Sequence, residues 1–146
     1  MNNKQMRKIN KIILHCTATP EGRHTTVEDI RRWHKAQGWS DIGYHYVVYL
    51  DGSVHEGRPV DIVGAHTKGH NTGSISVVYV GGIDKMNLKP KDTRTEEQKE
   101  ALHKLLTNLL GKYKGATLHG HNEFAPKACP SFNVKTVYKN LIKFYE

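Results

Sequence analysis

The chain has 146 residues, of which 37% are hydrophobic and 25% charged, and its formal net charge at pH 7 is +8. This length predicts one domain, residues 1–146, and leaves no room for a second module. The composition is that of a folded globular protein and excludes disordered, fibrous and membrane-spanning chains.

The positive charge favours a polyanionic partner, either nucleic acid or an anionic envelope polymer. From Lys104 onward seven lysines face two glutamates, which gives this last third a net charge of +5. A solvated basic face would explain the same pattern. Nucleic-acid binding is not expected, because no recognition helix, aromatic-rich sheet motif or zinc-finger spacing is present.

The N-terminal segment is basic, but only Ile12, Ile13 and Leu14 form an apolar run there, which is too short for the core of a signal peptide. No apolar run reaches about 18 residues, so membrane insertion is not expected. Cys16 and Cys129 are the two cysteines, too few for a disulfide framework. We therefore expect synthesis in the cytoplasm.

Apolar periodicity and turn signals predict alternating strands and helices along the chain. In order, they are a strand at 11–16, a helix from Thr25 or Thr26 to about 37, a hairpin at 45–50 and 54–56, a loop at 57–74, a strand at 75–80, a polar connection at 84–94, a helix at 95–113, a strand at 116–118, an irregular segment at 119–132 and a helix at 133–145. The expected fold is α/β: a single domain whose central mixed sheet is flanked by helices.

Two helices are expected to bury one stripe each. The stripe of the first helix consists of Val27, Ile30, Trp33 and His34. That of the last helix consists of Val134, Val137, Tyr138, Leu141 and Ile142. Trp33 and Trp39 are expected to pack in the core and at its rim rather than to stack on a sugar.

Three side chains stand out chemically among ten histidines and two cysteines. His15, His121 and Cys129 lie at strand ends or in a loop, and two imidazoles with one thiolate form a typical three-residue catalytic zinc site. His119 shares the strand parity of His121, so spacing does not decide between them. A buried thiol and hydrogen-bonded histidines would explain the same residues, and we interpret Cys16 as a core thiol.

Five blocks of the sequence, in this order, resemble the zinc-dependent N-acetylmuramoyl-L-alanine amidases, above all the amidase-type phage lysozymes. The blocks are Ile13 to Thr19, Gly43 to Tyr46, Gly64 to His66, Asn71 to Gly82 and His121 to Phe132. Peptidoglycan recognition proteins share this fold. Two residues depart from the family pattern, Asn122 in place of a second histidine and Ser76 in place of a glycine, which affects the expected substrate fit more than catalysis.

The resemblance implies that His15, His121 and Cys129 hold one zinc ion and that Tyr44 and Lys127 are catalytic. Zinc would activate water for attack on the lactyl carbonyl, Lys127 would stabilise the oxyanion, and Tyr44 would position the water or transfer a proton. His66 is implied along the substrate cleft, and His45 is a second substrate-binding candidate. An exposed loop histidine would explain His66 as well.

The function implied by the resemblance is cleavage of the amide bond between N-acetylmuramic acid and L-alanine of peptidoglycan by a monomeric, phage-type endolysin. Such an enzyme would reach the wall through a holin-like pore or on lysis. Two alternatives stay open, a non-catalytic peptidoglycan-recognition module and a regulator that binds RNA polymerase. The cysteine at position 129 argues against the first, because recognition proteins without activity lack it.

Overall fold

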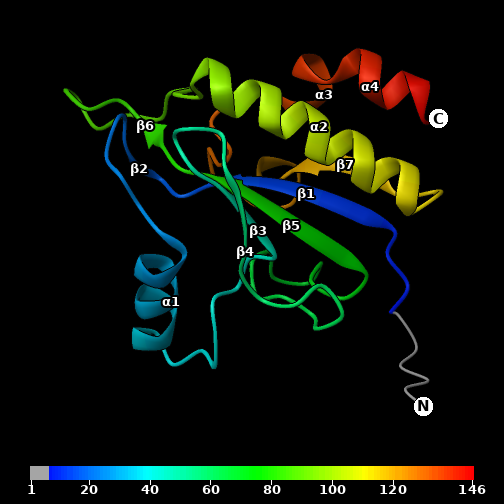
Figure 1. Cartoon of the computed structure of the whole chain (residues 1–146), viewed down its shortest axis with the longest axis horizontal. Coiled ribbons are helices and arrows are strands. Elements are labelled where there is room, and N and C mark those ends of the chain that lie inside the picture. The colour runs from blue at the N-terminus through cyan, green and yellow to red at the C-terminus, as the bar shows by residue number, and fades with distance from the viewer. Residues whose placement is uncertain (1–6) are drawn as a thin grey trace.

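The computed structural model describes residues 7–146 and places a five-stranded sheet, in the order β4-β3-β5-β1-β7, at their centre (Figure 1). Its strands are β1 (Lys11–Cys16), β3 (Tyr46–Val48), β4 (Val54–Glu56), β5 (Ser74–Tyr79) and β7 (Thr117–Gly120). β5 runs parallel to β3 and β1, β1 runs parallel to β7, and the edge strand β4 is antiparallel to β3. The sheet is therefore mixed, which confirms the predicted fold class.

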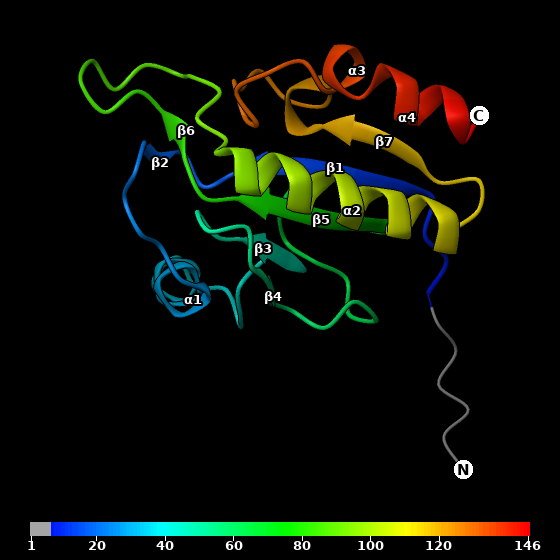
Figure 2. The same ribbon diagram turned by 45° about the horizontal axis from the view of Figure 1, so that its top comes forward.

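Helices cover both faces of this sheet (Figures 1 and 2). α2 (Glu96–Lys112) lies along one face, together with the short helices α3 (Val134–Val137) and α4 (Lys139–Phe144). α1 (Val27–Ala36) lies on the other side. The three-layer arrangement buries both faces of the central strands, which explains their continuous apolar runs.

The core has two parts because side chains alternate between the faces of each strand. On β5, Ile75 and Val77 pack in the cluster beneath α2, whereas Val78 packs in the cluster beneath α1. Leu14 and Cys16 of β1 belong to the α2 cluster, so Cys16 is the core thiol predicted. His15, between them, consequently faces the opposite side.

Both long helices begin with a capping box, in which each end residue accepts a backbone N–H of the other. Thr26 pairs with Asp29 at α1, which decides between the two predicted caps, and Thr95 pairs with Gln98 at α2 as predicted. Glu28, Asp29, Glu96 and Glu97 add negative charge near the positive ends of the helix dipoles.

The predicted helix at 133–145 is wrong in its continuity. It is divided into α3 and α4 at Tyr138, whose side chain is 6% exposed and whose hydroxyl accepts a hydrogen bond from Arg94. Val134 is buried as predicted, but Val137 is 45% exposed. One continuous stripe therefore does not describe this segment.

Two further expectations need correction. Trp33 is 37% exposed and so lies outside the predicted stripe, whereas His34 is buried as predicted, with Nδ1 accepting the backbone N–H of Gly43 at 2.8 Å. A parallel pair of two-residue strands, β2 (Thr19–Pro20) and β6 (Gly82–Ile83), was not predicted. Such short strands leave no periodicity to detect.

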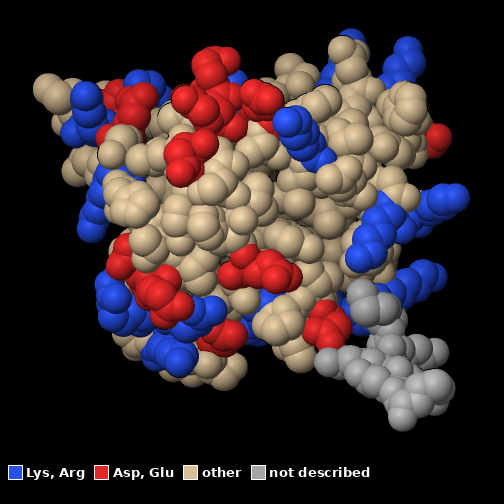
Figure 3. All heavy atoms as spheres, in the orientation of Figure 1, with Lys and Arg blue, Asp and Glu red and all other residues tan. Residues whose placement is uncertain are grey.

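Charged side chains of both signs share the face drawn in Figure 3, with acidic groups over the first turns of α2 and basic groups toward its C-terminal end. Within residues 7–146, no helix is both long and apolar enough to span a membrane.

Candidate metal centre and its cleft

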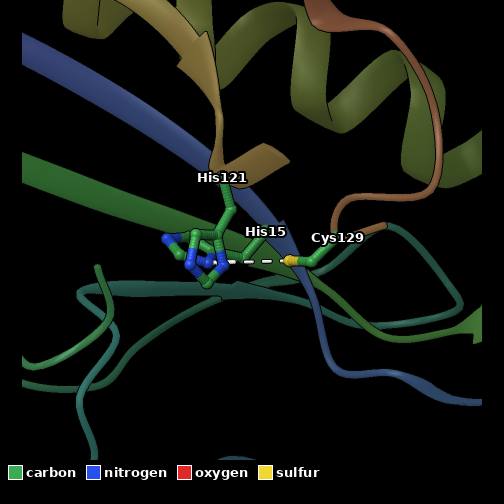
Figure 4. A group of neighbouring side chains, drawn as sticks. All are labelled: His15, His121 and Cys129. Atoms are coloured by element: carbon green, nitrogen blue, oxygen red, sulfur yellow. Dashed lines mark hydrogen bonds between the residues drawn. The ribbon is translucent and has the colours of Figure 1, made fainter. Parts of the chain in front are cut away.

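The candidate metal centre lies where two parallel strands end side by side. β1 and β7 pair with Leu14 opposite Gly120. The next residues, His15 and His121, therefore lie together at the C-terminal ends of the two strands. His121 opens a single 3-10 turn, η1 (His121–Glu123), and the chain then folds back to bring Cys129 against β1. Figure 4 shows the three side chains converging.

One potential ligand atom from each of these residues lies within 4.8 Å of the other two. The Sγ atom of Cys129 is 3.7 Å from Nδ1 of His15, and the rings of His15 and His121 are 4.7 Å apart at their centroids. His15 is 0% and His121 8% exposed. The structure thus brings together the three residues that the sequence singles out, in an arrangement that can hold a metal ion.

Burial keeps both histidines in the form that coordinates metals. It holds the pKa of His15 well below 6.5, with His66 and His121 adding repulsion, and it lowers the pKa of His121 together with the nearby charge of Lys127. Both imidazoles are therefore neutral near pH 7, with a lone pair available.

The sulfur of Cys129 is held by the backbone of β1, since the N–H of Cys16 donates to Sγ at 3.2 Å. The neighbouring Cys16 thiol and burial raise the pKa of Cys129. Without a cation this residue is therefore a thiol, and metal binding has to displace its proton.

His119 lies apart from this cluster. Its Nδ1 atom is 2.8 Å from a carboxylate oxygen of Glu123, and Nε2 is 2.6 Å from the hydroxyl of Thr117. The structure thus separates the two histidines that spacing alone left equivalent.

A cleft of about 690 Å³ opens beside the cluster. One wall comes from the loop around residues 65–71 and the other from the segment between His121 and Lys127. Its lining residues are Trp39, Ala65, His66, Thr67, Lys68, Asn71, His121, Phe124, Ala125, Pro126 and Lys127. An open cleft next to a potential metal site provides room for an extended substrate.

The two side chains expected to be catalytic both lie near the cluster. Lys127 lines the cleft, and its charge lowers the pKa values of both His15 and His121. The ring of Tyr44 is 5.2 Å from that of His15. Burial raises the pKa of Tyr44, so its hydroxyl keeps its proton at neutral pH.

The two histidines expected to bind substrate have different surroundings. His66 lines the cleft, and burial lowers its pKa to about 3. His45 is 0% exposed and does not line the cleft. Its Nε2 faces the carbonyl of Ile62 at 2.8 Å and its Nδ1 accepts the N–H of Ser76 at 3.1 Å. His45 therefore lies buried behind the residues that line the cleft. The His45 side chain would have to move to contact a bound substrate.

Two residues that shape the cleft, Asn71 and Trp39, were not predicted to do so. The Oδ1 atom of Asn71 accepts the backbone N–H groups of His66 and Thr67 at 3.0 and 2.8 Å and so holds the wall loop. Trp39 also lines the cleft, whereas packing in the core or at its rim was expected for it. The signal available in the sequence for this loop was Gly69-His70-Asn71, a histidine between a glycine and an asparagine.

The N-acetylmuramoyl-L-alanine amidase family, Amidase_2, matches residues 5–132. The endolysin of Escherichia phage T7 is 48% identical over 132 residues, which are 90% of this chain and 87% of that protein. Peptidoglycan-recognition protein SC2 of Drosophila melanogaster is 31% identical over 114 residues, 75% of this chain and 59% of that protein.

A solved structure titled N-acetylmuramoyl-L-alanine amidase LysC from Clostridium intestinale URNW has a similar fold, with a TM-score of 0.78 and 28% identity. The similarity covers 92% of this chain and 86% of that chain. Sequence and fold comparisons thus point to the same group of proteins.

Proposed function

Because the chain belongs to the N-acetylmuramoyl-L-alanine amidase family, we propose that it is a zinc-dependent endolysin that cleaves the bond between N-acetylmuramic acid and L-alanine in peptidoglycan. The observation that carries this proposal is the convergence of His15, His121 and Cys129 beside an open cleft. The phage relatives are endolysins by name.

The donor set fits zinc. Two neutral imidazoles and one cysteine sulfur are ligands that zinc prefers, and three protein ligands leave a position open, as in catalytic sites. Zinc bound there would supply Lewis acidity that activates water for attack on an amide carbonyl. His15, His121 and Cys129 would hold it.

Lys127 would provide a positive charge for the reaction. Its side chain lines the cleft next to His121, where the carbonyl oxygen of a bound amide becomes negative as the carbon turns tetrahedral. A fixed cation at that position stabilises the transition state more than the ground state.

Tyr44 would act through a hydrogen bond of its protonated hydroxyl. Because burial raises its pKa, the phenol does not lose its proton unaided at neutral pH. It can orient the attacking water or donate to the leaving amine. His66 would contact the substrate from the cleft wall.

The first experiment measures the zinc content of the purified protein and the new L-alanine amino groups released from purified peptidoglycan, before and after chelation. We expect one zinc per chain and release that the chelator abolishes. His15→Ala should lose both, whereas the matched variant His103→Ala, at an exposed position of α2, should keep both. Zinc without release would instead favour a recognition module, and the absence of zinc from folded protein would refute the metal site.

Binding to RNA polymerase stays a prediction from the family resemblance, as do the monomeric state and release through a holin-like pore. Retention of the protein on immobilised polymerase, compared with a column without polymerase, tests the first of these.

A further inference from the structure

The two nitrogens of the His15 ring face different partners. Nδ1 lies 3.7 Å from Sγ of Cys129, within the candidate metal cluster. Nε2 lies 3.0 Å from Nδ1 of His66, on the cleft wall. One nitrogen is therefore available to a metal ion, while the other is engaged by a second histidine.

The direction of the hydrogen bonds follows from Ser74 at the far end of this chain of contacts. The hydroxyl of Ser74 donates to the backbone carbonyl of Asn71 at 3.0 Å. Since a hydroxyl has one hydrogen, its oxygen accepts at 3.1 Å from Nε2 of His66. A neutral His66 with its proton on Nε2 has an acceptor at Nδ1, which receives the Nε2–H of His15.

Thr67 fits the same assignment. Its hydroxyl oxygen lies 3.0 Å from Nδ1 of His66 and 3.4 Å from Nε2 of His15. Because Nδ1 of His66 has a single lone pair, a Thr67 hydroxyl that donates to it takes the place of His15, which then donates to Thr67 over the longer 3.4 Å. Both arrangements leave the proton of His15 on Nε2. The lone pair of His15 is then on Nδ1, on the side of Cys129.

The ring of His66 has little freedom to leave this position. Its backbone is held by Asn71, and Ser74 is fully buried on β5, opposite Lys11 of β1. The α-carbon of Gly64 approaches so closely that a Cβ there would lie 2.8 Å from Cδ2 of His66. The Nδ1 acceptor of His66 is thus held in place from β5, the strand that pairs with β1, and β1 carries His15.

We propose that His66 is a positioning residue that fixes the tautomer and the orientation of His15 as a metal ligand, with Ser74 setting the proton on His66. The inference rests on the proposed function, and it gives His66 a role through His15 besides any contact with substrate. Partners of this kind orient ligating histidines, make them more basic and change metal affinity by about 10 to 100-fold.

Two substitutions at position 66 separate the hydrogen bond from the space that the ring fills. His66→Asn keeps an acceptor oxygen close to the position of Nδ1, whereas His66→Leu has a similar shape there but no acceptor. We expect His66→Leu to weaken zinc binding about 10 to 100-fold in competition with a chelator of known affinity. His66→Asn should recover most of that loss.

A second pair of variants tests Ser74, at the far end of the series of hydrogen bonds that begins at His15. Ser74 and Ser76 are both fully buried on β5, and each hydroxyl contacts a histidine. Ser76 contacts His45, which lies away from His15. Ser74→Ala should therefore weaken zinc binding, and Ser76→Ala should leave it unchanged.

The tautomer is measured directly in metal-free protein by long-range ¹H–¹⁵N NMR of the histidine rings. The expected result is a proton on Nε2 of His15 in the parent protein. In His66→Leu only the longer 3.4 Å contact with Thr67 remains, so a mixture of tautomers is expected. A parent protein with the proton on Nδ1, or a His66→Leu variant that binds zinc as tightly as the parent, would overturn the proposal. A parent protein that binds no zinc would refute the proposed function, while the NMR result would still decide the tautomer assignment.

Discussion

The backbone N–H of Cys16 donates to Sγ of Cys129 at 3.2 Å, which ties the loop that carries the third candidate ligand to the strand that carries the first. This contact uses the backbone of Cys16, whereas its thiol packs in the core beneath α2. The Cys16 thiol also lies against that of Cys129, so the two cysteines are in contact but differ in their main roles, packing for Cys16 and metal binding for Cys129.

Substitution of each cysteine should accordingly give a different result. Cys129→Ser should lose zinc and amidase activity, because the thiolate ligand is removed. Cys16→Ala should keep zinc, since the N–H donor remains, and should lower the free energy of unfolding by about 1 kcal/mol through lost packing. Zinc content and denaturant unfolding check both variants. A zinc-loaded, fully active Cys129→Ser protein would contradict the assignment of Cys129.

Lys127 should matter for turnover rather than for metal binding. We expect Lys127→Met to lower kcat by about 10² to 10³-fold, the usual effect of removing one group that stabilises an oxyanion, with unchanged zinc content. Lys68→Met is the control, because Lys68 lines the same cleft. Equal losses in the two variants would indicate a general need for positive charge in the cleft instead of a specific role for Lys127.

The candidate site could be predicted in its residues but not in its connections. His15 and Cys129 stand out as soft ligands at a strand end and in a loop, whereas the choice of His121 over His119 came from the family resemblance. The contact between His15 and His66 joins residues 51 positions apart, and no local pattern encodes it. The burial of His45 was missed for the same reason, since its partner Ser76 is 31 positions away.

The fold could be predicted further than the site because periodicity is a local property. The central strands follow from this periodicity, and both helix starts follow from another local signal, the cap residues three positions apart. The division of the last helix at Tyr138 does not, since it depends on the burial of that ring and on its hydrogen bond with Arg94, 44 positions earlier. Local patterns cannot include such a partner.

Stability should fall in acid partly because His45 is buried in its neutral form. Burial lowers its pKa to about 4, from an ordinary value of 6.5. The unfolded chain therefore binds a proton on this residue between these pH values while the folded chain does not, so stability is present above pH 6.5 and decreases as the pH falls toward 4. The shift corresponds to about 3 kcal/mol.

Unfolding of metal-free protein by denaturant at several pH values measures this effect. His45→Gln should show a shallower decrease in the free energy of unfolding between pH 6.5 and 4 than the parent protein. His103→Gln, at an exposed position, should retain the slope of the parent. An unchanged slope in His45→Gln would mean that His45 is not the group that takes up the proton.

Gln98 should be the most sensitive polar residue of α2, because its buried side chain joins the helix cap to the sheet. Its Oε1 accepts the N–H of Thr95 at 2.9 Å, and its Nε2 donates to the carbonyls of Val48 and Val80 at 3.2 and 3.0 Å. Gln98→Leu removes all three bonds in a fully buried place. We expect a loss of about 2 to 4 kcal/mol in the free energy of unfolding.

The neighbouring variants define what this loss means. Thr95→Ala removes the cap oxygen and the hydrogen bond from the same hydroxyl to the carbonyl of Leu50, and it should cost about 1 to 2 kcal/mol. Glu97→Leu, at an exposed position of the same turn, should cost only a few tenths. Since none of the three side chains has a hydrogen bond to His15, His121 or Cys129, zinc content should stay unchanged in all three. If Gln98→Leu proved no more costly than Glu97→Leu, the link between helix and sheet would rest on apolar packing beneath α2 alone.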